Sequence, residues 1–444
     1  MMRIRLAAIA FTAAALIAPS LADANGRLPD GTSVRVDGDK ILFPSTFGLL
    51  TSDDDGASFQ WVCEVNIGYG GTYDPDYAVS ANGDIWATTF EGLRVSRDDG
   101  CTWETVNGSE PFYSDVEIGP DGRIWAATAS GGAPNDVYVS SDGVNFVGSN
   151  LLDPIIWWRS VRVAPSDADT LYVTGFKLAQ ADGNGGMLPP EAHLRKSIDG
   201  GATWAELPVT DFTFGSSPNL FVVAVAPADP NIVFARVLGA RDPTGDDIYR
   251  SIDGGATWTL ALSFQDFVNA FTILSDGLTV IAGTRGNCIG DEPDNMKGCV
   301  QRSEDLGATW ALATQQPKMG CIHEGQNGEV LACGANWEPD NFALGRSTDK
   351  GQTWSKIVRF SELAGPLSCP VESPQFECSA LDWPSLCVQL GICDTVDAGG
   401  SANDAGEGED DGGKGGGCFG CSSGTSGLAL IVVLPILWRR RKRE

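Results

Sequence analysis

One eight-residue pattern recurs seven times along the chain and constrains the fold more than any other feature. It reads Ser-x-Asp-x-Gly-x-Thr-Trp. Short Ser and Asp side chains bond to turn amides, and Gly permits a positive φ, so each copy predicts a tight turn between two strands. Five copies carry every defining residue. One spans 96–103, and the others are Ser197, Asp199, Gly201 and Trp204; Ser251, Asp253, Gly255 and Trp258; Ser303, Asp305, Gly307 and Trp310; and Ser347, Asp349, Gly351 and Trp354. A variant spans 52–59, and the copy at 140–146 is one residue short.

A second repeat lies upstream of each turn and has the same period. It consists of apolar strand cores, which fall at 41–43, 85–87, 124–126, 171–173, 232–234, 280–282 and 330–332. A turn such as Asn82-Gly83 or Asn327-Gly328 precedes most of these cores, and another strand precedes the turn. Four strands per unit predict an all-β, seven-bladed β-propeller over residues 25–363. How the ring closes stays open, because no spare N-terminal strand is visible.

The eight-residue pattern resembles the Asp box of sialidase-type (BNR) propellers. That resemblance implies that each box joins the third and fourth strands of a blade, on the side away from the ligand. The Ser, Asp, Gly and Trp residues of the boxes are then structural. The same resemblance places the connections between second and third strands on the functional face.

The beginning of the chain and its cysteines indicate export. Residues 1–22 have a basic start, a short apolar run and a small-residue exit, as in a cleaved signal peptide; a retained anchor is the alternative. The 12 cysteines suit disulfides outside the cytosol. We expect Cys321 to pair with Cys333 across a hairpin and Cys288 with Cys299 around one loop. With only two histidines and no zinc-ribbon spacing, we expect no metal and no cofactor.

Three segments follow the predicted propeller. Residues 364–394 hold four cysteines and predict a small disulfide-linked cap or stalk, with three possible pairings among the four. Residues 395–417 are rich in Gly, Asp and Glu and predict a flexible linker. Residues 418–444 combine Cys418 and Cys421, a short apolar run and an Arg cluster, which resembles the myxobacterial MYXO-CTERM sorting tail. That resemblance implies delivery to the cell surface with processing near Cys418 or Cys421; a plain membrane anchor is the alternative.

The net charge and the long loops limit which partners the protein can bind and where. A formal charge of −28 argues against a nucleic-acid partner. We expect a monomer. The connections between second and third strands are longest in blades four to seven, and long loops on a rigid scaffold often bind ligands. Our candidate ligand-binding residues in these connections are Asp182, His193, Arg241, Asp246, Asp247, Arg285, Asp291, Trp337 and Glu338.

A catalytic set is not evident. The chain has Arg35-Val36-Asp37 where a sialidase has an Arg-Ile-Pro motif, it has few tyrosines, and acidic loops would repel an anionic sugar. The tryptophans Trp157-Trp158, before the first strand of blade four, suit either sugar stacking or the core. We therefore predict a non-catalytic surface module that binds a protein or a glycan. The alternative is a glycoside hydrolase that uses two carboxylates, as in the xyloglucan-cleaving propellers.

Overall fold

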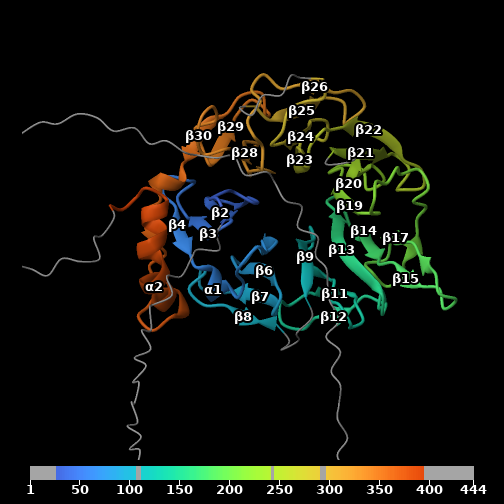
Figure 1. Cartoon of the computed structure of the whole chain (residues 1–444), viewed down its shortest axis with the longest axis horizontal. Helices are drawn as coiled ribbons and strands as arrows, with labels where there is room; N and C mark the ends of the chain where they lie inside the picture. The colour runs from blue at the N-terminus through green and yellow to red at the C-terminus, as the bar shows by residue number, and fades with distance from the viewer. Residues whose placement is uncertain (1–26, 107–111, 242–244, 291–296, 395–444) are drawn as a thin grey trace, which may run out of the picture. The chain divides into compact units, whose positions relative to one another are not determined.

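The computed structural model describes residues 27–106, 112–241, 245–290 and 297–394. These residues form seven antiparallel four-stranded sheets that follow one another in chain order, as Figure 1 shows. The prediction of an all-β propeller with seven four-stranded blades is confirmed. The predicted signal peptide, linker and tail, with Cys418 and Cys421, lie outside the described residues. Within the described ranges, no helix is long and apolar enough to cross a membrane.

Each blade is one contiguous stretch of chain. The strands of blades one to four are β1 (Arg35–Asp37), β2 (Lys40–Ser45), β3 (Gly48–Ser52), β4 (Gln60–Val62); β5 (Tyr77–Val79), β6 (Ile85–Thr89), β7 (Gly92–Ser96), β8 (Glu104–Thr105); β9 (Tyr113–Ile118), β10 (Ile124–Thr128), β11 (Val137–Ser140), β12 (Val147–Gly148); and β13 (Ile156–Ala164), β14 (Asp167–Lys177), β17 (Glu191–Ser197), β18 (Ala205–Glu206). Blade four also carries the hairpin β15 (Gln180–Ala181) and β16 (Met187–Leu188).

Blades five to seven repeat the same order. Their strands are β19 (Leu220–Val225), β20 (Val233–Arg241), β21 (Gly245–Ser251), β22 (Thr259–Ser263); β23 (Val268–Ile273), β24 (Val280–Thr284), β25 (Cys299–Ser303), β26 (Ala311–Leu312); and β27 (Cys321–Glu324), β28 (Val330–Cys333), β29 (Leu344–Ser347), β30 (Ser355–Val358). Second strands such as β6, β10 and β24 are buried at every residue, because both of their faces pack against neighbouring blades. These strands contain the apolar cores that repeat in the sequence.

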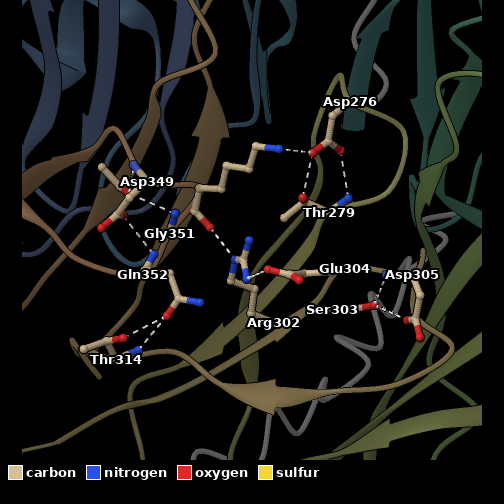
Figure 2. Close-up of polar contacts among 12 residues, drawn as sticks. Asp276, Thr279, Arg302, Ser303, Glu304, Asp305, Thr314, Asp349, Gly351 and Gln352 are labelled. Carbon is tan, nitrogen blue, oxygen red and sulfur yellow. Dashed lines mark hydrogen bonds and ion pairs between the residues drawn. The ribbon is translucent and has the colours of Figure 1, made fainter.

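All seven copies of the repeat are turns between the third and fourth strands, with one hydrogen-bond pattern. In blade six, the Ser303 hydroxyl donates to Asp305 Oδ1 at 2.7 Å and accepts from the Gly307 amide at 2.8 Å. Asp305 also accepts from the Thr309 amide at 2.8 Å and the Thr309 hydroxyl at 2.6 Å. Figure 2 shows this turn beside the corresponding turn of blade seven at Asp349 and Gly351. The predicted turn geometry is therefore present.

The repeat turns also connect neighbouring blades. Gly351 has φ +81°, and a Cβ placed there would lie 2.6 Å from Ile281 of blade six. Lys350, in the same turn, donates from its ammonium to Asp276 at 2.8 Å and accepts from Arg302 Nε at 2.7 Å through its carbonyl. The positions of Asp276 and Arg302 beside the turn are shown in Figure 2. Each turn thus fixes a blade against the blade before it.

The ring closes through the innermost strands and the C-terminal segment. The first strand of each blade contacts the first strand of the next, and β27 contacts β1 in the same way. After blade seven, the turn η2 (Phe360–Glu362) leads into β31 (Gly365–Pro366), which pairs in parallel with β4. Helix α2 (Pro374–Gln389) then packs on blade one, where α1 (Glu64–Ile67) also lies. The segment after the last blade thus adds a fifth strand to the sheet of blade one.

Five disulfides join the described residues. The two pairings proposed from the sequence, Cys321–Cys333 and Cys288–Cys299, are both present. The expectation that the four cysteines of 364–394 pair among themselves is wrong. Only Cys387–Cys393 is internal, whereas the others form Cys63–Cys378 and Cys101–Cys369. The reason is that α2 lies against blade one, which brings its cysteines beside those of the first two blades.

Candidate functional site

The propeller has two faces that differ in how the chain connects its strands. The turn face carries the connections from first to second and from third to fourth strands, including all seven repeat turns. The loop face carries the connections from second to third strands and from one blade to the next. The sequence analysis placed all nine candidate ligand-binding residues in the connections from second to third strands.

Several of these residues lie in strands, although the sequence analysis placed them in loops. His193 is in β17, Arg241 is in β20, and both Asp246 and Asp247 are in β21. The ladder pairs Lys177 with Glu191 in blade four and Arg241 with Gly245 in blade five. These hairpins continue beyond the apolar strand cores, so only residues 242–244 separate β20 from β21.

Asp246 is fully buried and serves the packing between blades. Its carboxylate accepts from Arg236 Nε at 2.6 Å, the Gly239 amide at 2.7 Å and the Val268 amide at 2.8 Å. Burial raises the pKa of Asp246, and Arg236 partly opposes that rise. The three donors occupy the carboxylate, so Asp246 orients Arg236 and the start of β23.

Two further candidates form ion pairs. Asp247, also buried, accepts from Arg241 Nε at 2.7 Å, and Arg241 additionally donates to the Ser263 hydroxyl at 2.6 Å. Arg285 pairs with Asp30 and donates to the Gly31 carbonyl at 2.8 Å, which ties blade six to the segment before blade one. Among the nine proposed residues, Arg241 and Asp247 are the two that form an ion pair with each other within the described ranges.

The remaining candidates are scattered over the loop face. Asp182 accepts from the amides of Asn184 and Gly186 at 2.7 and 2.8 Å, and so shapes its own hairpin turn. His193 lies 3.4 Å from Glu206 through Nδ1. Trp337 is 52% exposed, and Glu338 follows it in the same loop. Asp291 lies outside the described residues.

A polar cavity of about 210 Å³ lies among the innermost strands. Its charged lining consists of three arginines from different blades, Arg35, Arg162 and Arg236. Each arginine pairs with one aspartate, at 3.0 Å for Arg35–Asp76, 2.7 Å for Arg162–Asp115 and 2.6 Å for Arg236–Asp246. Uncharged residues, among them Asn269, Val223 and Phe271, also line this central cavity.

The aspartates Asp76 and Asp115 hold two of these arginines, Arg35 and Arg162. Asp115 is buried, and burial raises its pKa, with Arg162 opposing the rise and Asp76 adding to it. Its carboxylate also accepts from the Val161 amide at 2.6 Å. Glu117 lies 3.8 Å from Arg162, and burial raises the pKa of Glu117 as well.

His323, on the innermost strand of blade seven, completes the set of titratable groups. Burial, with the charge of Arg35 as a second cause, lowers the pKa of His323 to about 3. A neutral imidazole next to paired ions adds hydrogen-bonding capacity without charge.

The sequence analysis missed this central group. The available signal was the presence of charged residues in first strands that are otherwise apolar, as in Asp115-Val116-Glu117 and Val161-Arg162-Val163. Such residues alternate with core positions, so their side chains must face the ring axis or a neighbouring blade. Only the closed ring shows that they meet.

The two tryptophans of blade four, for which the sequence suggested either sugar stacking or a place in the core, differ in burial. Both lie within β13, which begins at Ile156, rather than before the strand. Trp158 is buried and donates from its indole to the Leu151 carbonyl at 3.1 Å, so it is core. Trp157 is half-buried and packs edge-on against Phe176 with ring centroids 5.5 Å apart.

Metal binding has little support within the described ranges. The one close group of potential ligands there is Cys63, Cys378 and Asp382, and the two cysteines form a disulfide.

Comparison with known proteins gives partial relatives. No family model matches the chain. The chain is 24% identical over 223 residues to the xyloglucanase Xgh74A of Acetivibrio thermocellus, which is 46% of this chain and 25% of that protein. It is 31% identical over 91 residues to the dispase autolysis-inducing protein of Streptomyces mobaraensis, covering 20% of this chain and 24% of that one. The matched part thus spans about a quarter of each relative.

Solved structures with similar folds include two of different kinds. The GH74 enzyme of Niastella koreensis aligns with a TM-score of 0.41 and 16% identity, covering 76% of this chain and 66% of that one. YCF48 from Cyanidioschyzon merolae aligns with a TM-score of 0.44 and 13% identity, covering 68% and 92%. The sequence similarity to a glycoside hydrolase covers 46% of this chain.

Proposed function

We propose that this protein is a non-catalytic surface module that binds a glycan at the loop face, over the central cavity. The observation that carries the proposal is the cavity itself, where arginine, amide and aromatic side chains from different blades line one opening. Sugar-binding sites combine hydrogen-bonding groups in fixed positions with apolar rings. Similarity to a xyloglucanase over 46% of the chain supports a carbohydrate ligand rather than a protein.

The state of the carboxylates supports binding over hydrolysis. A two-carboxylate glycosidase needs its acid and its nucleophile or base about 5 to 9.5 Å apart, with the sugar between them. Asp76 pairs with Arg35 at 3.0 Å, and Asp115 pairs with Arg162 at 2.7 Å. Asp246 accepts three hydrogen bonds and is closed to solvent. These arrangements leave the three aspartates suited to orienting arginines rather than attacking a sugar.

A glycoside hydrolase is the second candidate function, because the sequence similarity to Xgh74A favours it. In that case Asp115, whose pKa is raised by burial, would serve as the acid, and a further carboxylate of the loop face would act as the base. Asp115→Asn separates the two candidates, since it removes the acid but keeps the side chain's size.

The disulfides support export. Five disulfides in the described residues fit an oxidising compartment outside the cytosol. We propose that the C-terminal tail holds the protein at the cell surface.

The test is to incubate the purified chain with a panel of plant and bacterial oligosaccharides and to record retained ligand and released sugar by mass spectrometry. We expect the chain to retain an oligosaccharide without releasing sugar, and we expect Asp115→Asn to give the same result. Released sugar that disappears in Asp115→Asn would replace the proposal with the hydrolase. A result in which no oligosaccharide is retained and no sugar is released would indicate a protein partner and would contradict the proposal.

A further inference from the structure

One arginine of the loop face has no partner of opposite charge. Arg159 lies on β13 and forms no hydrogen bond or ion pair with any residue that the structure describes. The three cavity arginines, in contrast, each pair with an aspartate. A half-buried guanidinium without a counter-ion is costly, because burial removes water that is not replaced by other acceptors. Burial accordingly lowers the pKa of Arg159, with no carboxylate opposing it.

Two aromatic rings hold this arginine in place. The guanidinium carbon lies 5.3 Å from the ring centroid of Phe176 in blade four and 5.3 Å from that of Phe221 in blade five. Contacts with ring faces use the flat side of a guanidinium and leave its N–H edge free. The rings fix the orientation of Arg159 without occupying its donors.

The backbone at Arg159 is irregular in a way that changes where the side chain points. The pairing of β13 with β14 shifts between Trp158 and Ser160, so Arg159 is the extra residue of a β-bulge. Bulges of this kind re-aim a side chain and are common next to binding sites. Because β13 and β19 both begin at the loop face and β14 ends there, Arg159, Phe176 and Phe221 all lie near that face.

We infer that Arg159 recognises a carboxylate on the glycan, so that the ligand class is an acidic oligosaccharide containing a uronic acid. This inference rests on the proposed glycan-binding function. A fixed guanidinium edge matches the two oxygens of a planar carboxylate, which it binds through two parallel hydrogen bonds. Trp157, packed against Phe176, adds an indole next to the same position for the sugar ring.

The negative charge of the whole chain does not prevent this recognition. Two of the acidic residues expected on the loop face, Asp246 and Asp247, are buried against Arg236 and Arg241. Counter-ions screen more distant charges beyond about 8 Å at physiological salt. The unpaired guanidinium therefore offers a local positive charge to a small anionic ligand.

Titration calorimetry with two matched sugars tests the inference. The probes are an oligogalacturonate and its methyl ester, which differ only in charge, with a xyloglucan oligosaccharide as the neutral comparison. The wild-type chain is expected to prefer the acid over the ester by about tenfold, the usual size of a charge-assisted bidentate contact. Arg159→Met is expected to remove that preference, and Arg159→Lys to restore only part of it. Arg97→Met, on the turn face, is the control that keeps it.

The outcomes separate this inference from the proposed function. If neutral and acidic sugars bind equally, or Arg159→Met keeps the preference for the acid, the role of Arg159 is wrong while glycan binding stands. Binding of the acid alone upholds both. If no sugar binds, both are wrong. Preference for an oligoglutamate peptide over oligogalacturonate would also overturn the assignment to a glycan. Circular dichroism checks that Arg159→Met folds.

Discussion

The two faces of this propeller use polar residues in opposite ways. On the turn face, seven copies of one short motif repeat one hydrogen-bond pattern, and each Asp satisfies amides within its own turn. On the loop face and along the axis, the ion pairs differ from one blade to the next: Arg35–Asp76 and Arg162–Asp115 join neighbouring blades, whereas Arg236–Asp246 lies within blade five. Uniform bonding within one motif indicates a structural role, whereas varied pairing indicates a site that can distinguish ligands.

The largest expected effect comes from breaking a buried ion pair. Asp246→Ala leaves Arg236 without its counter-ion and the amides of Gly239 and Val268 without an acceptor. Removing one partner of a buried ion pair typically costs about 3 to 5 kcal/mol. We expect a loss of this size in the free energy of unfolding, measured by urea denaturation. A loss below about 1 kcal/mol would mean that the pair is exposed to solvent and would weaken the contrast between the faces.

A smaller effect is expected from the repeat turns. Gly201 has φ +81°, and a Cβ there would lie 2.8 Å from Trp125 of the preceding blade. Gly122 has φ +83° with nothing within 4 Å, so Gly122→Ala controls for backbone strain alone. We expect Gly201→Ala to lower the free energy of unfolding by about 1 to 3 kcal/mol more than Gly122→Ala, because of overpacking. Equal losses would show that the turns do not lock neighbouring blades.

The response to pH sharpens the comparison, because the pKa values of Asp253 in a repeat turn and of Asp115 beside the central cavity shift in opposite directions. Hydrogen bonds from Thr257 lower the pKa of Asp253 to about 2. Its stabilisation is present above the ordinary aspartate value of about 3.9 and is lost as pH falls toward the folded value. Burial raises the pKa of Asp115, so its stabilisation is present below that ordinary value and is lost as pH rises.

Urea midpoints measured across pH test these directions. Asp253→Asn is expected to flatten the fall in stability below about pH 4, and Asp115→Asn to flatten the fall above about pH 4. Each variant serves as the control for the other. The interpretation fails if either substitution changes the slope in the other's window.

The smallest effect is expected at the rim of the loop face. Trp337 is 52% exposed, so Trp337→Ala removes little buried surface. We expect a change within about 0.5 kcal/mol in the free energy of unfolding. A larger loss by thermal denaturation would mean that the loop is part of the core.

The sequence predicts what depends on short stretches of chain. Ser303, Asp305 and Gly307 determine a turn by themselves, and the apolar cores determine the second strands, so blade number and order follow from the repeat. Features that depend on distant segments could not be predicted. Asp115 meets Arg162 of the next blade, and Cys101 meets Cys369 only because α2 returns to the first blades. Even Asp246 was recognised by its charge but misplaced in a loop, since the extension of β20 and β21 has no apolar signal.

The central claim is that the loop face binds the ligand while the turn face only holds the blades together. Two asparagines whose side chains form no hydrogen bond with the described residues test it directly. Asn269 lines the central cavity, and Asn327 lies in a turn on the opposite face. With whichever oligosaccharide the panel retains, calorimetry on Asn269→Ala should show binding weakened by about five- to tenfold, as for one lost hydrogen bond, and Asn327→Ala should stay within about twofold. Weaker binding by Asn327→Ala with full affinity in Asn269→Ala would place the site on the turn face and contradict the account.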